Sequence, residues 1–157
     1  MAITTAIPTS FKKELLTKKH DFGDSLTSPI GGDSFKGVLI KATPTGTYGA
    51  ASTNYSDITG NSDEATDTSS PQGYTAGGFA LTNAGIATSG TTVYNDWADV
   101  TLSAVTLSAD GLMIINTTNS NAAVELHNFG STKTASGGDF QITFPTADAS
   151  NAILRLA

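Results

Sequence analysis

The pattern of apolar residues along the chain predicts β-strands in several places. The run Phe35–Ala42, rich in Val, Leu and Ile, is typical of a strand that ends at Thr43-Pro44. The clearest alternation of apolar and polar residues spans 96–109. Its apolar positions change parity near Ser103-Ala104, which predicts a β-bulge or a strand break there.

Shorter apolar runs predict further strands, and the turn residues between them predict the connections. Asp110-Gly111 predicts a hairpin turn, and Ser136–Gly138 predicts a loop. Eight or so short strands with such connections are typical of a sandwich or jelly roll. We therefore predict an all-β fold, a single β-sandwich or jelly-roll-like domain. The additional strands are expected at residues 74–81, 86–87, 92–94, 112–115, 124–129, 140–144 and 151–156.

One short amphipathic helix is predicted near the start of the chain, at residues 9–19. Ser10 is a suitable N-cap, and Phe11, Leu15 and Leu16 lie close together on the helix surface. Because a helix of two to three turns is marginal in water, we expect it to dock on another surface. Residues 1–22 are thus interpreted as an N-terminal arm with a short helix, and residues 23–157 as the sandwich domain.

A long polar stretch at about residues 45–72 shows little periodicity and predicts a surface loop. Its isolated apolar residues, Tyr48, Tyr55 and Ile58, predict partial ordering against a surface. Its three acidic residues are interpreted as a solvated patch, with a weak ion site as the alternative, because their spacing lacks the ligand pattern of a calcium loop. These are Asp63, Glu64 and Asp67.

Composition agrees with a β-rich, loop-rich protein. Of the 157 residues, 38% are hydrophobic and only 14% are charged, with many Gly, Ser, Thr and Asn residues, which disfavour helices. The absence of cysteine excludes disulfides and thiolate metal sites. No apolar run reaches membrane-spanning length and the start lacks signal-peptide features, so we expect a soluble protein that is made in the cytoplasm and binds no membrane.

The net charge of −6 is unevenly distributed. Residues 1–41 carry six lysines against four acidic residues, a net charge of +2, and the remainder carries −8. An acidic body with Arg155 as its only arginine argues against nucleic-acid binding, which needs clustered cations.

Candidate chemistry is sparse. His20 and His127 are the only histidines, and neither lies in a catalytic motif. His127 is interpreted as an ordinary strand histidine, and no pair of carboxylates is marked for general acid–base catalysis. We predict that the protein is not an enzyme and has no catalytic, cofactor or metal residues.

The candidate functional residues are therefore contacts for assembly. Trp97, the only tryptophan, precedes the best strand and is predicted to anchor the core or a subunit interface, with a ligand contact as the less favoured alternative. The helix lysines either dock on an acidic partner or form a solvated face. The candidate assembly contacts are Phe11, Lys12, Lys13, Leu15, Leu16, Lys18 and Lys19.

Five segments together form a recurrent pattern: an amphipathic helix, a Val/Leu/Ile strand, a Gly-Tyr-Thr-Ala-Gly-Gly segment, an aromatic-acidic strand and a strand with Asp-Gly. They are Ser10–Leu16, Lys36–Ile40, Gly73–Gly78, Asp99–Leu102 and Ala109–Leu112. In this combination the chain resembles a family of small structural proteins encoded in the genomes of tailed bacteriophages. It departs from them in the Ser/Thr-rich insertion near residues 45–72 and in a more polar ending at 146–150.

The resemblance implies a virion protein without catalytic residues, and within that class it favours a capsid decoration or cement protein. Its expected partners are the major capsid protein or other virion proteins and further copies of itself, as a trimer. A tail, neck, adaptor or receptor-binding fibre component is the first alternative. A secreted carbohydrate-binding or hydrolytic β-sandwich is less favoured, because the sequence shows neither an export signal nor clustered aromatic residues.

Overall fold

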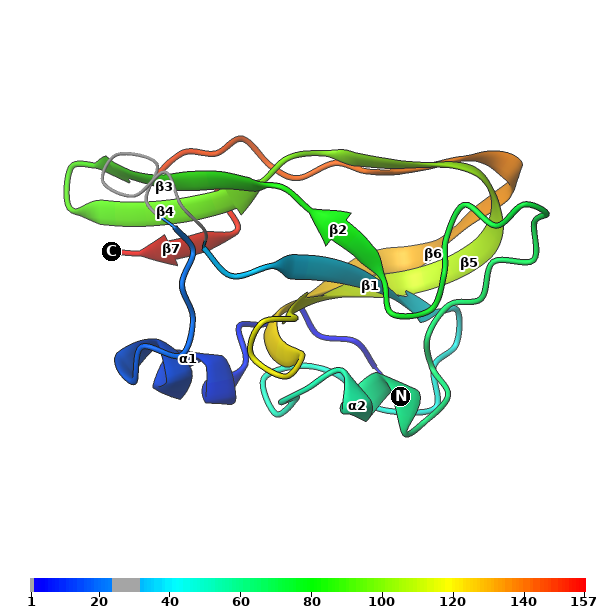
Figure 1. Cartoon of the computed structure of the whole chain (residues 1–157), viewed down its shortest axis with the longest axis horizontal. Coiled ribbons are helices and arrows are strands. Elements are labelled where there is room, and N and C mark those ends of the chain that lie inside the picture. The colour runs from blue at the N-terminus through cyan, green and yellow to red at the C-terminus, as the bar shows by residue number, and fades with distance from the viewer. Residues whose placement is uncertain (1, 24–31) are drawn as a thin grey trace.

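The computed structural model describes residues 2–23 and 32–157 and confirms an all-β protein, with 47% of its residues in strands and 8% in helices. The strands form two antiparallel sheets, one of order β2-β1-β5-β6 and one of order β3-β4-β7 (Figure 1). The elements are α1 (Thr9–Leu16), β1 (Phe35–Lys41), α2 (Ser56–Thr59), β2 (Phe79–Leu81), β3 (Asn83–Ser89), β4 (Thr92–Trp97), β5 (Val100–Asn116), β6 (Ala122–Ile142) and β7 (Leu154–Leu156).

Two long strands, β5 and β6, replace several of the short strands that the sequence predicts. They pair along almost their whole length, and the register shifts between Leu102 and Val105, where Ala104 has a φ of 57°. The bulge predicted near Ser103-Ala104 is thus confirmed. The loop predicted at Ser136–Gly138 is wrong, because these residues lie within β6, where Gly137, with a φ of 67°, has no partner in the β5 register.

The hairpin turn predicted at Asp110-Gly111 is also wrong, because β5 continues through it to Asn116. Gly111 serves a different purpose there. A Cβ atom at Gly111 would lie 2.5 Å from the carbonyl oxygen of His127 and 2.8 Å from the side chain of Ile3. Glycine is therefore needed for the close approach of β6 and the N-terminal segment.

The sheet is buried on both faces where β1 pairs with the second half of β5, which explains the continuous apolar runs there. One face packs on the main core with Leu39, Leu112 and Trp97. The other face carries Val38 and Met113. It is covered by Tyr48 and Ile58 from the polar stretch and by Ile3 from the N-terminal segment. The partial ordering predicted for that stretch is confirmed, and it acts as a third layer over the sheet (Figure 1).

The N-terminal segment is built into the same core and does not form a separate arm. The backbone N–H groups of Ala6 and Leu126 each donate a hydrogen bond to the other residue's carbonyl oxygen, both at 3.0 Å. Ile3 and Phe11 are buried. Deleting residues 1–19 would therefore remove core side chains together with any assembly contact.

Two element boundaries differ from the prediction. Helix α1 ends at Leu16, its N-cap is Pro8, and the hydroxyl of Ser10 donates instead to the carbonyl oxygen of Ser52 at 3.3 Å. The strand predicted at residues 74–81 is formed only over β2, because the backbone before it turns around Asp67.

Neither helix in the described ranges has the length and apolar character needed to cross a membrane.

Candidate functional site: an apolar groove beside the first helix

An apolar groove of about 450 Å³ lies between α1 and the edge of the β3-β4-β7 sheet. Figure 1 shows β7 on the side of β4 that faces α1. The helix contributes Phe11, Lys12 and Leu15 to the groove, and the strands contribute residues 93–95 of β4 and 154–156 of β7. Segments from opposite ends of the chain thus form its two walls.

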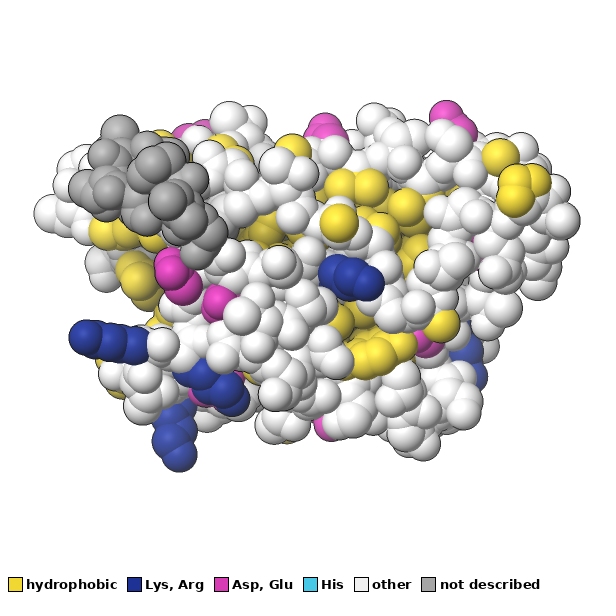
Figure 2. All heavy atoms as spheres, viewed as in Figure 1, with side chains coloured by type: hydrophobic (Ala, Val, Ile, Leu, Met, Phe, Trp, Pro, Cys, Tyr) yellow, Lys and Arg dark blue, Asp and Glu magenta, His cyan; other side chains and the backbone are white. Residues whose placement is uncertain are grey.

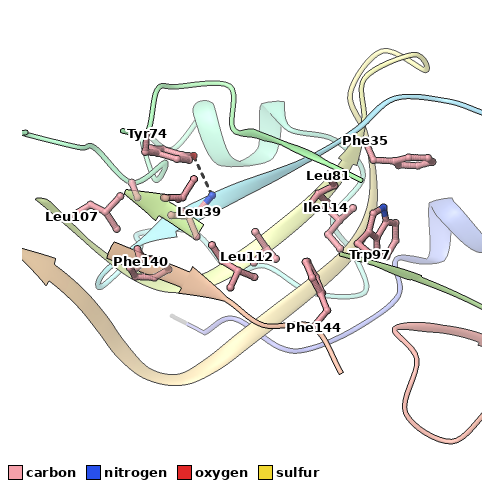
Figure 3. Packing of buried hydrophobic residues seen from close by; sticks show 14 of the residues in the cluster. Phe35, Leu39, Tyr74, Leu81, Trp97, Leu107, Leu112, Ile114, Phe140 and Phe144 are labelled. Carbon is pink, nitrogen blue, oxygen red and sulfur yellow. Dashed lines mark hydrogen bonds between the residues drawn. The ribbon is translucent and has the colours of Figure 1, made fainter. Parts of the chain in front are cut away.

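Aromatic side chains connect this groove to the centre of the core. The ring centroid of Phe11 lies 6.1 Å from that of Phe22, which also lines the groove. Phe22 stacks on Phe35 with centroids 4.9 Å apart and meets Trp97 edge-on at 6.3 Å. Figure 3 shows Trp97 beside Phe35 and Phe144. The floor of the groove therefore rests on a continuous aromatic cluster.

His20 fixes α1 to the rest of the chain. Its buried ring packs on Phe11 with centroids 4.8 Å apart. Its Nε2 atom lies 2.8 Å from a carboxylate oxygen of Glu14, and its Nδ1 atom lies 2.9 Å from the side-chain amide of Asn116. Both ring nitrogens are therefore engaged, so this histidine positions the helix.

Exposed apolar side chains concentrate at this groove. Among the residues the structure describes, the large hydrophobic side chains that remain exposed are Leu16 at 89%, Leu156 at 64% and Val93 at 39%. Val93 and Leu156 line the groove, and Leu16 follows the groove residue Leu15 in α1. Apolar surface gathered in this way around one concave site is typical of a binding surface.

The groove carries a small excess of positive charge. Among the described residues its lining contains two cations, Lys12 and Arg155, and one acidic residue, Asp21. Figure 2 shows dark-blue cationic side chains projecting around α1 at the lower left, with yellow hydrophobic atoms above them. Lys19, which follows α1, pairs with Glu14.

The structure brings together only part of the predicted set of assembly contacts. Phe11, Lys12 and Leu15 line the groove, whereas Lys13, Leu16, Lys18 and Lys19 lie outside its lining. Phe11 is 1% exposed, so its main contact is with the chain's own core, a correction to its expected role at an interface. Trp97 is 3% exposed and lies in the core, in agreement with the first of its predicted alternatives.

The acidic residues of the polar stretch are not a solvated patch, and this prediction is wrong. Asp63 and Asp67 are buried. The carboxylate of Asp67 accepts hydrogen bonds from the backbone N–H groups of Ser69, Gly73, Tyr74 and Thr106, at 2.8 to 3.0 Å. An irregular segment that covers a sheet must satisfy its own backbone donors, and these carboxylates do so.

Glu64 connects the same segment to the loop before β2. It accepts hydrogen bonds from the hydroxyl groups of Tyr55 and Tyr74 and, at 2.8 Å, from the backbone N–H of Gly77. Burial and the neighbouring carboxylate raise the pKa of Tyr55 to about 12. Within residues 2–23 and 32–157, no group of three or more His, Asp or Glu side chains is arranged to hold a metal ion.

Sequence reasoning missed a second group of ionisable side chains, formed by the buried Asp96 of β4 and Glu125 of β6 with the half-buried His127 of β6. The His127 ring nitrogen Nε2 lies 3.4 Å from Glu125, and Asp96 interacts electrostatically with both residues. Within the described part of the chain, no hydrogen-bond partner reaches Asp96 Oδ2, Glu125 Oε2 or His127 Nε2, and none reaches the neighbouring Trp97 Nε1. Burial raises the pKa of both carboxyl groups, so the folded state favours their protonated forms.

Replacing Glu125 with Gln is expected to raise the free energy of unfolding at pH 7 by on the order of 1 kcal/mol. Because folding raises the pKa of Glu125, its contribution is most favourable below the unfolded value and is lost as the pH rises through the folded pKa. Urea unfolding between pH 4 and pH 8 measures the effect, with the exposed Asp139→Asn on the same strand as the control. A variant less stable than the parent at pH 8 would contradict this account.

Comparison of the chain with protein-family models, with curated proteins and with solved structures found no match.

Proposed function

We propose that this protein is a structural component of the virion of a tailed bacteriophage, and that it attaches to another virion protein through the apolar groove beside α1. The observation that carries the docking role is the concentration of exposed large hydrophobic side chains at the groove. The phage assignment rests on the sequence resemblance, and the β-rich fold is compatible with it.

A binding role suits the chemistry of the groove better than catalysis. Its lining is mainly apolar, with cations at Lys12 and Arg155, and its one histidine has both ring nitrogens engaged. A histidine that acts as a general base needs a free nitrogen within reach of a substrate proton. The surface therefore offers burial and charge to a partner, and its histidine is engaged in positioning α1.

Within the virion we favour a capsid decoration protein that binds and stabilises the assembled head. A tail, neck, adaptor or fibre component is the alternative, and it would use the same groove. Assembly as a trimer stays a prediction. Cryo-electron microscopy of the particle distinguishes the two locations, since density for this fold would lie on the shell or on the tail.

Replacing Leu156 with Asp is expected to weaken binding to particles that lack the protein at least tenfold, because it puts a charge into an apolar contact. Leu156 is 64% exposed in the chain, so the free energy of unfolding should change by less than about 0.5 kcal/mol. Co-sedimentation with particles measures the binding. Thr101→Asp, at an exposed position of β5 outside the groove lining, is the matched control. Unchanged binding by Leu156→Asp would refute docking through the groove.

A further inference from the structure

We infer that the groove takes an extended segment of a different protein, with apolar side chains at alternate positions and acidic side chains at its ends, laid alongside the outer edge of β7. This inference deepens the proposed attachment and rests on the groove being the docking surface. Three features of the groove carry it: the edge of β7, the spacing of the apolar side chains and the charge.

The first feature is an open strand edge. In the described chain β7 pairs with β4 on one side only, through Val93, Tyr94 and Asn95, and it ends the sheet order β3-β4-β7. No other backbone hydrogen bond of the described chain reaches residues 154–156. An edge strand offers its outward N–H and C=O groups to another extended chain. Three residues span about 10 Å, enough for one or two backbone pairs.

The second feature is the spacing of the apolar side chains beside that edge. Leu154 and Leu156 alternate with Arg155 along β7, and both leucines line the groove. The half-buried Leu15 faces them from α1, where the ring of Phe11 lies buried beneath the groove. An extended segment presents every second side chain to one side, so one with apolar residues at alternate positions would fill the groove between the leucines and the helix.

The third feature is charge, which favours acidic side chains at the two ends of the bound segment. Lys12 lies at the helix side of the groove and Arg155 at the β7 side, and Asp21 is the one acidic residue among the described residues of the lining. Arg155 donates a hydrogen bond to the carbonyl oxygen of Ser150, which holds its guanidinium beside β7. Acidic side chains at the ends of the bound segment would complement this arrangement, and basic ones would be repelled.

A second copy of this chain fits the groove poorly. Contact between two grooves would bring Lys12 and Arg155 of one copy close to the same cations of the other. Contact between the groove and a different face would meet few highly exposed large hydrophobic side chains, because those of the described residues lie at or next to the groove itself. A partner of different sequence, with its own apolar side chains, avoids both difficulties.

The test uses the full chain and a fluorescent peptide, acetyl-Asp-Val-Thr-Leu-Thr-Val-Asp-amide, followed by fluorescence anisotropy. The comparison peptides carry Lys in place of both Asp residues, or Pro in place of the central Leu. We expect the acidic peptide to bind at least tenfold more tightly than either, and the difference between acidic and basic peptides to shrink in high salt. Lys12→Glu should weaken the acidic peptide about fivefold or more. Lys13→Glu, on the same helix but outside the lining, is the control.

The outcomes separate this inference from the proposed function. Equal binding of acidic and basic peptides, or binding that persists in Leu156→Asp, overturns the inference even where the same variant loses particle attachment. A third outcome is that the parent binds the acidic peptide, Leu156→Asp does not bind it, and Leu156→Asp still attaches to particles. This outcome supports the groove chemistry and refutes the proposed function. A fall in oligomeric mass of Leu156→Asp by light scattering would show that a second copy occupies the groove, which also overturns the inference.

Discussion

Replacing Trp97 with alanine is expected to lower the free energy of unfolding by about 3 to 5 kcal/mol. The side chain is 3% exposed and meets Phe22, Phe35 and Phe144 with ring centroids 5.9 to 6.3 Å apart. Removing the indole would leave a cavity at the point where the second sheet joins the main core (Figure 3). Urea unfolding followed by circular dichroism, which does not depend on tryptophan emission, measures the loss.

Two further variants test whether lost packing of the indole causes the fall in stability. Trp97→Phe should recover part of the stability, because the indole Nε1 donates no hydrogen bond to the residues that the structure describes. Leu16→Ala, at a side chain that is 89% exposed, should change the free energy of unfolding by less than about 0.5 kcal/mol. A Trp97→Ala variant with the parent's denaturation midpoint would show that Trp97 does not hold this core together.

Local pattern predicted the β-rich class, strand β1 and the bulge in β5, because each depends on neighbouring residues. Local pattern wrongly predicted a turn or a loop where a glycine lies inside a continuous strand. Asp110-Gly111 carries the signal of a tight turn, but its glycine accommodates the carbonyl oxygen of His127 and the side chain of Ile3. Only the contacts of Gly111 with His127 and Ile3 in the folded chain show that Asp-Gly continues a strand here and does not form a turn.

The groove could not be predicted from sequence because its walls are about 140 residues apart. The amphipathic helix was predicted, and its need for a docking surface was recognised from its length. Nothing local indicates that α1 docks beside β7, or that Phe11 turns inward while Leu16 stays exposed. The buried pair Asp96 and Glu125 likewise comes from two strands that meet only in the folded chain.

Replacing Asp63 with Asn is expected to destabilise the protein by about 3 to 5 kcal/mol at pH 7. The buried carboxylate accepts hydrogen bonds from the backbone N–H groups of Thr45 and Gly46 at 2.9 and 2.7 Å, and from the hydroxyl of Tyr48 at 2.6 Å. Lys41 pairs with it at 2.9 Å. An asparagine there would turn an amide donor towards groups that are themselves donors, and would leave the Lys41 charge without its partner.

The same site makes the parent sensitive to acid. Burial alone would raise the pKa of Asp63, but the backbone N–H of Thr45 and its other donors outweigh burial and lower the pKa well below its usual range. Its stabilisation is therefore present above the unfolded pKa of about 3.9 and is lost as the pH falls towards the folded pKa. Unfolding in urea at pH 7 and at pH 2.5 should show the difference between the parent and Asp63→Asn shrinking in acid. Asp139→Asn, at an exposed carboxylate, should follow the parent at both pH values. If Asp63→Asn matched the parent at pH 7, the polar stretch would be held over the sheet by its apolar side chains alone, Tyr48 and Ile58 foremost.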